Sequence, residues 1–86
     1  MFYGIYHVAI PKISNFALYL AKSKDGLTNW EEVQLIQEYA SQPKVWLNPK
    51  GDDILVAFES SPPSRGNFVA IKHFQDLDQL KQGKSK

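Results

Sequence analysis

The stretch that decides the fold is Ser23-Lys24-Asp25-Gly26-Leu27-Thr28-Asn29-Trp30, which separates the apolar runs 16–21 and 33–36. Asp25-Gly26 is the strongest short turn signal in the chain. An Asp side chain accepts hydrogen bonds from nearby backbone N–H groups, and Gly adopts a positive φ without steric cost. We therefore predict a β-hairpin in which Asp25 and Gly26 form a structural turn and the Trp30 ring folds back over that turn as a clamp.

Short strand signals separated by turns occupy the rest of the chain. Aromatic and β-branched residues predict strands at 2–10, 16–22, 44–47, 54–58 and 68–74. Both faces of the first two segments are apolar, which predicts strands covered on both sides. The continuous apolar run at 54–58 predicts a central, buried strand, and residues 76–81 predict one helical turn or a short edge strand. About six or seven strands at this spacing are typical of a sandwich, barrel or propeller.

Residues 28–40 have two interpretations. Residues 28–31 fit a helical capping box, and the apolar residues that follow Trp30 fall near helical spacing. The preceding turn and the alternation around Val33 and Leu35 fit a strand instead. A strand makes the chain all-β, whereas a helix makes it a small α+β domain.

The segment ends at residues 41–43, where Pro43 biases Gln42 toward extended backbone. The strand–turn–strand pattern before this point is similar to the pattern after it. We therefore predict a single small domain over residues 1–80, built from two units at about 1–40 and 41–80, with residues 81–86 as a disordered tail.

Composition excludes several classes of function. The 86 residues are 43% hydrophobic, which is too apolar for a disordered chain. A net charge of +1 without a basic stripe argues against nucleic acid as a partner. The absence of cysteine removes disulfides, thiol nucleophiles and thiolate metal sites. No apolar run approaches the roughly 18–20 residues of a membrane span. We therefore predict a soluble protein without a membrane partner, and its location, extracellular or cytoplasmic, stays open.

Residues 19–26 together with Trp30 resemble the blade hairpins of five-bladed β-propeller glycosidases of the arabinanase and β-xylosidase type. In that family an apolar strand runs into a Ser-x-Asp-Gly turn that is followed by a Trp. The turn is also similar to a shortened sialidase Asp-box. Residues 41–45 and 50–59 resemble the next blade, so the resemblance covers about residues 16–74. It implies an all-β chain of antiparallel, propeller-like blade hairpins that form an incomplete propeller.

The resemblance has two departures from the family pattern. Gln42 stands where the family has an acid before Pro, and an amide cannot ionise. Two partial blades also lack the set of carboxylates that glycoside hydrolysis requires. A five-bladed propeller has about twenty strands. The unpaired strands of this chain therefore require self-association, another chain or further blades to cover them.

Exposed aromatic rings are the candidates for binding a ligand. Trp and Tyr rings stack on sugar faces through apolar C–H contacts, and their polar atoms reach hydroxyl groups. The predicted ligand-binding residues are Trp46, Trp30, Gln42 and Tyr19. In the alternative interpretation, Trp30 and Trp46 fill the core.

Acidic residues and histidines offer little further chemistry. Glu59 closes the 54–58 strand and is the only residue that we assign to catalysis, against the alternative of a structural ion pair. Asp52 and Asp53 are adjacent acids in a turn, which are usually solvated rather than metal-bound. His7 and His73 lack metal-ligand spacing, so we predict that each has one ring nitrogen bonded to a neighbour. We predict no metal and no cofactor.

These observations lead to three hypotheses. The first is a non-catalytic carbohydrate-associated or protein-interaction module derived from a glycosidase-like β-propeller. The second is a fragment of an active glycoside hydrolase that uses Glu59, the only form in which we would expect an enzyme. The third is a small α+β regulatory domain with a helix at residues 28–40.

Overall fold

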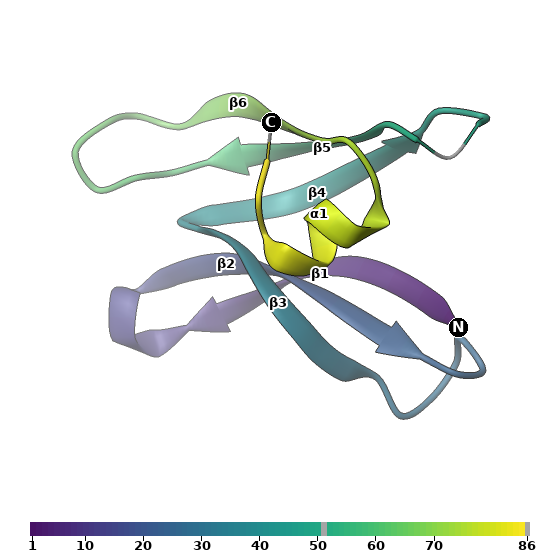
Figure 1. The fold of residues 1–86 in the computed structure, drawn as a ribbon. Coiled ribbons are helices and arrows are strands. Elements are labelled where there is room, and N and C mark those ends of the chain that lie inside the picture. Colours follow the sequence, from purple (N-terminus) through teal and green to yellow (C-terminus); the bar gives the residue numbers. More distant parts are fainter. Residues whose placement is uncertain (51, 86) are drawn as a thin grey trace.

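The computed structural model describes residues 1–50 and 52–85, and they form two three-stranded antiparallel sheets (Figure 1). Sheet A contains, in spatial order, β1 (Phe2–Ile10), β2 (Asn15–Ser23) and β3 (Glu31–Glu38). Sheet B contains β4 (Ala40–Leu47), β5 (Ile54–Ser60) and β6 (Phe68–Phe74). The 3-10 helix η1 (Pro11–Ile13) connects β1 to β2, and the helix α1 (Leu77–Gln82) follows β6. The chain is all-β, as predicted, and its two unclosed sheets fit an incomplete propeller-like domain.

Residues 28–40 contain a strand, so the α+β alternative is wrong. The register between β2 and β3 shifts twice, and the pairing skips Val33 and Ile36. Both side chains turn inward, where Ile36 is buried and Val33 packs against the core. Each β-bulge inserts one extra residue, so the inward-facing residues lie three apart instead of two. That spacing imitates a helix in the sequence.

The two sheets pack through their inner faces, and these faces form the core. The central strands β2 and β5 supply most of the buried side chains, and β6 adds one large ring. The largest fully buried apolar side chains are Phe74, Leu18, Leu20 and Val56. Burial of these chains provides the main stabilisation of a domain this small.

The helix α1 packs against β3 and β6 and lies in front of the gap between the sheets in Figure 1. The Asp76 side chain accepts from the Gln79 N–H at its start, and Gly83, with a φ of 69°, ends it. Leu80 enters the core. We predicted a disordered tail over residues 81–86, but the first two of these residues belong to α1, because burial of Leu80 and both caps extend the helix. Residue 86, the last of the predicted tail, lies outside the described residues.

The coverage of β1 and β5 differs from the prediction. β5 is central, as expected, but only its inner face is buried: Val56 is 0% exposed, whereas Leu55 is 38% exposed. β1 was predicted to be covered on both sides, yet it is an edge strand with Phe2 and Tyr6 exposed. The reason is that two packed sheets cover only one face of each other.

The chain passes from sheet A to sheet B through Tyr39 alone, so β4 begins before the strand predicted at 44–47. Gln42 has a φ of 53°, in the left-handed region, so the prediction that Pro43 keeps Gln42 extended is wrong. The register of β4 against β5 shifts at this point. The Gln42 N–H turns away from β5 and donates to Nδ1 of His7 at 2.9 Å, and this bond accompanies the bulge.

Three residues that are far apart in the sequence meet where the sheets join, and we call them the junction cluster: Asn15, Tyr39 and Ser61. The Ser61 N–H donates to the Tyr39 carbonyl at 2.8 Å. Nδ2 of Asn15 donates to the Ser61 carbonyl at 3.1 Å, and Oγ of Ser61 donates to Oδ1 of Asn15 at 3.1 Å. The cluster therefore links the start of β2 to the end of β5.

Candidate functional site

The outer face of sheet B contains an exposed tryptophan at the edge of an open hollow. Trp46 of β4 lies opposite Leu55 of β5, which lies opposite His73 of β6, so the three side chains share this face. Trp46 is 54% exposed and does not fill the core. The hollow measures about 530 Å³ and is lined by Trp46, Leu47, Asn48, Asp53 and Leu55. We call this open surface feature the Trp46 hollow.

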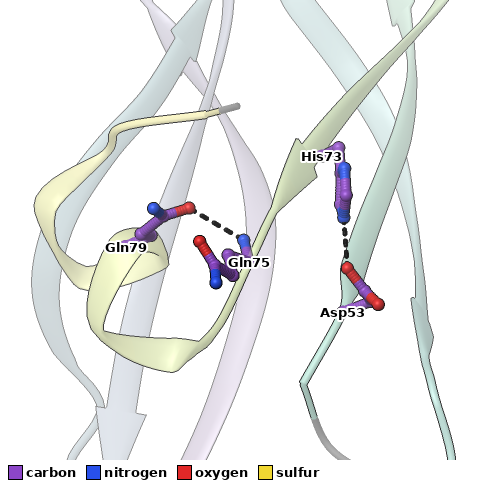
Figure 2. A network of polar contacts seen from close by, with 4 residues as sticks. All are labelled: Asp53, His73, Gln75 and Gln79. Atoms are coloured by element: carbon purple, nitrogen blue, oxygen red, sulfur yellow. Dashed lines mark hydrogen bonds and ion pairs between the residues drawn. The ribbon is translucent and has the colours of Figure 1, made fainter.

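An acid and an imidazole meet beside the Trp46 hollow. Figure 2 shows the Asp53 side chain pointing at the His73 ring, where Oδ1 of Asp53 and Nε2 of His73 form a hydrogen-bonded pair. Both side chains remain partly exposed. A carboxylate has about four lone-pair sites, so this pairing leaves Asp53 able to accept further hydrogen bonds.

Backbone contacts in the β4–β5 loop hold Asp53 in place. The Asn48 N–H donates to the Asp53 carbonyl at 3.0 Å, and the Lys50 N–H donates to Oδ1 of Asn48 at 2.9 Å. The first bond holds the backbone of Asp53 against that of Asn48, and the second orders Lys50 against the Asn48 side chain. The same end of sheet B therefore offers an apolar ring, a carboxylate and an imidazole.

The second aromatic surface lies on the outer face of sheet A and contains Tyr6, Tyr19 and Trp30; we call it the sheet-A patch. The rings of Tyr6 and Tyr19 lie 6.2 Å apart. The Trp30 ring lies across Gly4, where a Cβ would come 3.5 Å from Cζ3 of Trp30. A shallow hollow of about 270 Å³ separates Trp30 from Tyr6.

The sheet-A patch includes one polar contact. The Tyr6 hydroxyl donates to Oε1 of Glu32 at 3.0 Å. Burial, followed by this bond to Glu32, raises the pKa of the Tyr6 hydroxyl above its ordinary value. Tyr6 therefore stays protonated and keeps Glu32 fixed at the edge of the patch.

The 23–30 turn is saturated with its own hydrogen bonds. The Asp25 carboxylate accepts from the backbone N–H groups of Thr28 and Leu27 and from the Thr28 hydroxyl, all at 2.8–2.9 Å. Oγ of Ser23 lies 2.9 Å from Oδ1 of Asp25 and 2.7 Å from the Thr28 carbonyl, which gives its proton two acceptors. The Thr28 and Leu27 N–H groups and the two hydroxyls hold the pKa of Asp25 well below its ordinary value. These bonds fix the turn.

The ring that covers the turn is not the predicted one. A Cβ on Gly26 would come 3.0 Å from Cγ of Phe2, so the Phe2 ring lies over the turn. Trp30 instead covers Gly4 on the neighbouring strand. The left-handed backbone of Asn29, with a φ of 53°, directly precedes Trp30. The predicted Trp30 clamp is therefore replaced by Phe2.

The structure does not bring the four predicted ligand-binding residues together. Tyr19 and Trp30 share the sheet-A patch, whereas Trp46 lies on the outer face of sheet B. Because the inner faces pack against each other, these two outer faces point in opposite directions. Gln42 belongs to neither surface: its backbone contacts His7 at the β4 bulge. The residues thus divide between two separate surfaces.

Glu59, the predicted catalytic residue, lies near the end of β5 away from the Trp46 hollow. Nδ2 of Asn67 donates to its Oε1 at 2.8 Å. Its partners in register are Ser41 and Val69, which contribute no second carboxylate. Glycoside hydrolysis generally needs a pair of carboxyl groups about 5–10 Å apart. A catalytic role for Glu59 stays a prediction.

The histidine prediction is confirmed, but sequence reasoning did not place the partners. His7 accepts from the Gln42 N–H, and His73 pairs with Asp53. Asp53 was predicted as a solvated turn acid, and its contact with His73 depends on the register across the β5–β6 hairpin. The continuous apolar run at 54–58 does not show which of its faces is the outer one, so the sequence offered no signal for this contact.

Among residues 1–50 and 52–85, no three His, Asp or Glu side chains lie close enough together to hold a metal ion. The same part of the chain contains no helix with the length and apolarity needed to cross a membrane. Comparisons with protein-family models, curated proteins and solved structures found no match to this chain.

Proposed function

We propose that this chain is a non-catalytic carbohydrate-binding module with a glycosidase-like, propeller-derived fold. The observation that supports the proposal is the Trp46 hollow, in which an exposed indole ring lies beside the Asp53–His73 pair. A sugar presents both an apolar C–H face and a rim of hydroxyl groups. An exposed indole ring stacks on the apolar C–H face, and hydrogen-bonding side chains bind the hydroxyl groups.

In this proposal, four side chains of the hollow and the neighbouring His73 have distinct roles. Trp46 stacks on the pyranose or furanose face, and Leu47 and Leu55 border the ring with apolar surface. Asp53 accepts from sugar hydroxyls while His73 holds its carboxylate in position. A pair consisting of one carboxylate and one imidazole suits hydroxyl recognition, whereas hydrolysis requires two carboxyl groups across the glycosidic bond.

The resemblance to pentose-specific glycosidases guides the choice of probe. Affinity electrophoresis of the whole chain through gels that contain soluble arabinan or xylan measures binding without assuming which end of a polymer is recognised. We expect one of these polymers to retard the wild-type chain. The Trp46→Ala variant should bind about tenfold more weakly or worse, since tenfold corresponds to about 1.4 kcal/mol of lost contact energy.

The matched control is Trp30→Ala, which removes an equally large ring from the opposite outer face. We expect it to retain wild-type retardation. If Trp46→Ala, with an unchanged circular dichroism spectrum, still bound like the wild type, the assignment of the hollow would be wrong. If no polysaccharide in a panel of arabinan, xylan, glucan and mannan retarded the wild type, the proposed function itself would be wrong.

A further inference from the structure

The unpaired edge of β1 differs from every other sheet edge in the described residues. Natural edge strands carry charges, prolines or bulges, which prevent pairing with other chains. β1 has the sequence Phe-Tyr-Gly-Ile-Tyr-His-Val-Ala-Ile and contains no Lys, Arg, Asp, Glu or Pro. It also pairs with β2 over all nine residues without a register shift, so the strand is regular along its whole length.

The three other edge strands all carry protective features. β3 contains three glutamates, two bulges against β2 and a contact with α1. β4 contains Pro43, Lys44 and a bulge. β6 contains Lys72, whose Nζ donates to the Ile36 carbonyl of sheet A, and it also contacts α1. β1 contacts β4, but it alone among these four edges has no Lys, Arg, Asp, Glu, proline or bulge.

We propose that a second copy of this chain pairs with β1, antiparallel and about a two-fold axis, to form one continuous six-stranded sheet from two copies of sheet A. Addition of a strand to a free sheet edge satisfies its outward backbone N–H and C=O groups. A two-fold axis is the commonest symmetry of protein dimers and brings the same surface of both copies together. This interface is independent of the Trp46 hollow and of the proposed sugar binding.

The side chains of β1 form compatible pairs when the strand lies antiparallel to β1 of a second copy. Tyr6 is the central residue of β1, and we place the two-fold axis there. Phe2 then faces Ile10 of the second copy, and Gly4 faces its Val8. Gly4 leaves room for Val8, whereas Phe2 with Ile10 and Tyr6 with the second Tyr6 are aromatic–β-branched and aromatic–aromatic pairs, which are favourable across strands. No like charges meet across the axis.

Exposure and net charge also favour a second copy as the occupant. Met1, Phe2 and Tyr6 are exposed large apolar residues on or beside this edge, and pairing would cover part of their surface. The net charge of +1 per chain produces little repulsion between two copies. A charged partner segment would find no complementary charge along β1.

The mass of the chain in solution tests the proposal first. Sedimentation equilibrium over a range of concentrations should give twice the 9.8 kDa of one chain. Tyr6→Lys places two cations at the axis and should return the mass to that of a monomer. Ile71→Lys, which changes an exposed residue of β6 on the other sheet, is the matched control and should leave the dimer intact.

Disulfide trapping then locates the axis, and the absence of native cysteine makes the result unambiguous. Tyr6→Cys places two thiols across the axis, where paired strands hold their Cα atoms about 4.5–5.5 Å apart, within disulfide reach. Mild oxidation should convert this variant to a covalent dimer. Phe2→Cys is the control, because its two copies would lie roughly 27 Å apart, eight residues along the strand, and should stay monomeric under the same conditions.

Three outcomes would overturn the proposal. The first is a wild-type chain that is monomeric at every concentration tested. The second is a dimer that survives Tyr6→Lys but dissociates with Ile71→Lys, which would place the contact on sheet B. The third is a dimer in which none of the single-cysteine variants at Ile5, Tyr6 and His7 cross-links. A normal retardation by polysaccharide in the Tyr6→Lys monomer would leave the proposed function standing while the dimer is lost.

Discussion

Two independent constraints require glycine at position 26. Its φ is 74°, a backbone conformation that side chains with a Cβ adopt at a cost. The Phe2 ring also occupies the space where a Cβ would project. At this single residue, the turn of the β2–β3 hairpin and the start of β1 are packed against each other.

Gly26→Ala is therefore expected to lower the free energy of unfolding by about 1–2 kcal/mol from the left-handed backbone alone, with the Phe2 contact adding to the loss. Urea unfolding followed by tryptophan fluorescence measures the change. Gly66→Ala is the matched control, because a Cβ there meets nothing within 4 Å; it should change stability by less than about 0.5 kcal/mol. Equal losses in the two variants would contradict this account of the turn.

Asp25 makes the turn sensitive to acid. Hydrogen bonds from the Thr28 and Leu27 N–H groups lower the pKa of Asp25 in the folded chain, whereas the unfolded chain has the ordinary value of about 3.9. A lowered folded pKa stabilises the fold fully above the unfolded pKa, and this stabilisation is lost as the pH falls below it. We expect the urea midpoint of the wild type to fall between about pH 5 and about pH 2 by more than that of Asp25→Asn. Parallel pH profiles for the two proteins would contradict this role of Asp25.

At the scale of elements, β3 shows how a strand can imitate a helix. Two bulges turn Val33 and Ile36 inward three residues apart, so the hydrophobic spacing fits a helix although the backbone pairs with β2. The contrast between neighbouring positions is large: Ile36 is 4% exposed, whereas Leu35 is 37% exposed. Neighbours on opposite faces of one strand provide a direct test of this register.

Ile36→Ala should lower the free energy of unfolding by about 2–5 kcal/mol, because it leaves a cavity in the core. Leu35→Ala should cost about 1 kcal/mol or less, because half-exposed positions lose little packing. Chemical denaturation of both variants measures the difference. A larger loss for Leu35→Ala than for Ile36→Ala would show that β3 presents the opposite face to the core.

Elements that depend on local composition were predictable from the sequence. The strands at 2–10, 54–58 and 68–74 match β1, β5 and β6 because β-branched and aromatic residues fill them. The bulges were not predictable, since nothing local to Gln42 indicates a left-handed φ of 53° before a proline. That geometry accompanies a contact with His7, which lies 35 residues earlier in the sequence.

At the scale of the whole molecule, the candidate site was predictable only in part. Trp46 was expected to be either a binding residue or part of the core; its exposure contradicts the core interpretation, and the binding role stays a prediction. Separation of Trp46 from Trp30 and Tyr19 follows from the packing of two sheets, which no local pattern encodes. The same applies to the Asp53–His73 contact, which requires the register of β5 against β6.

The single-residue passage from sheet A to sheet B has a mechanical consequence. Tyr39 gives the chain no flexible linker about which the two sheets could rotate as separate bodies. Its carbonyl is also held by Ser61, which in turn bonds to Asn15. Separating the sheets at this corner must therefore break those bonds.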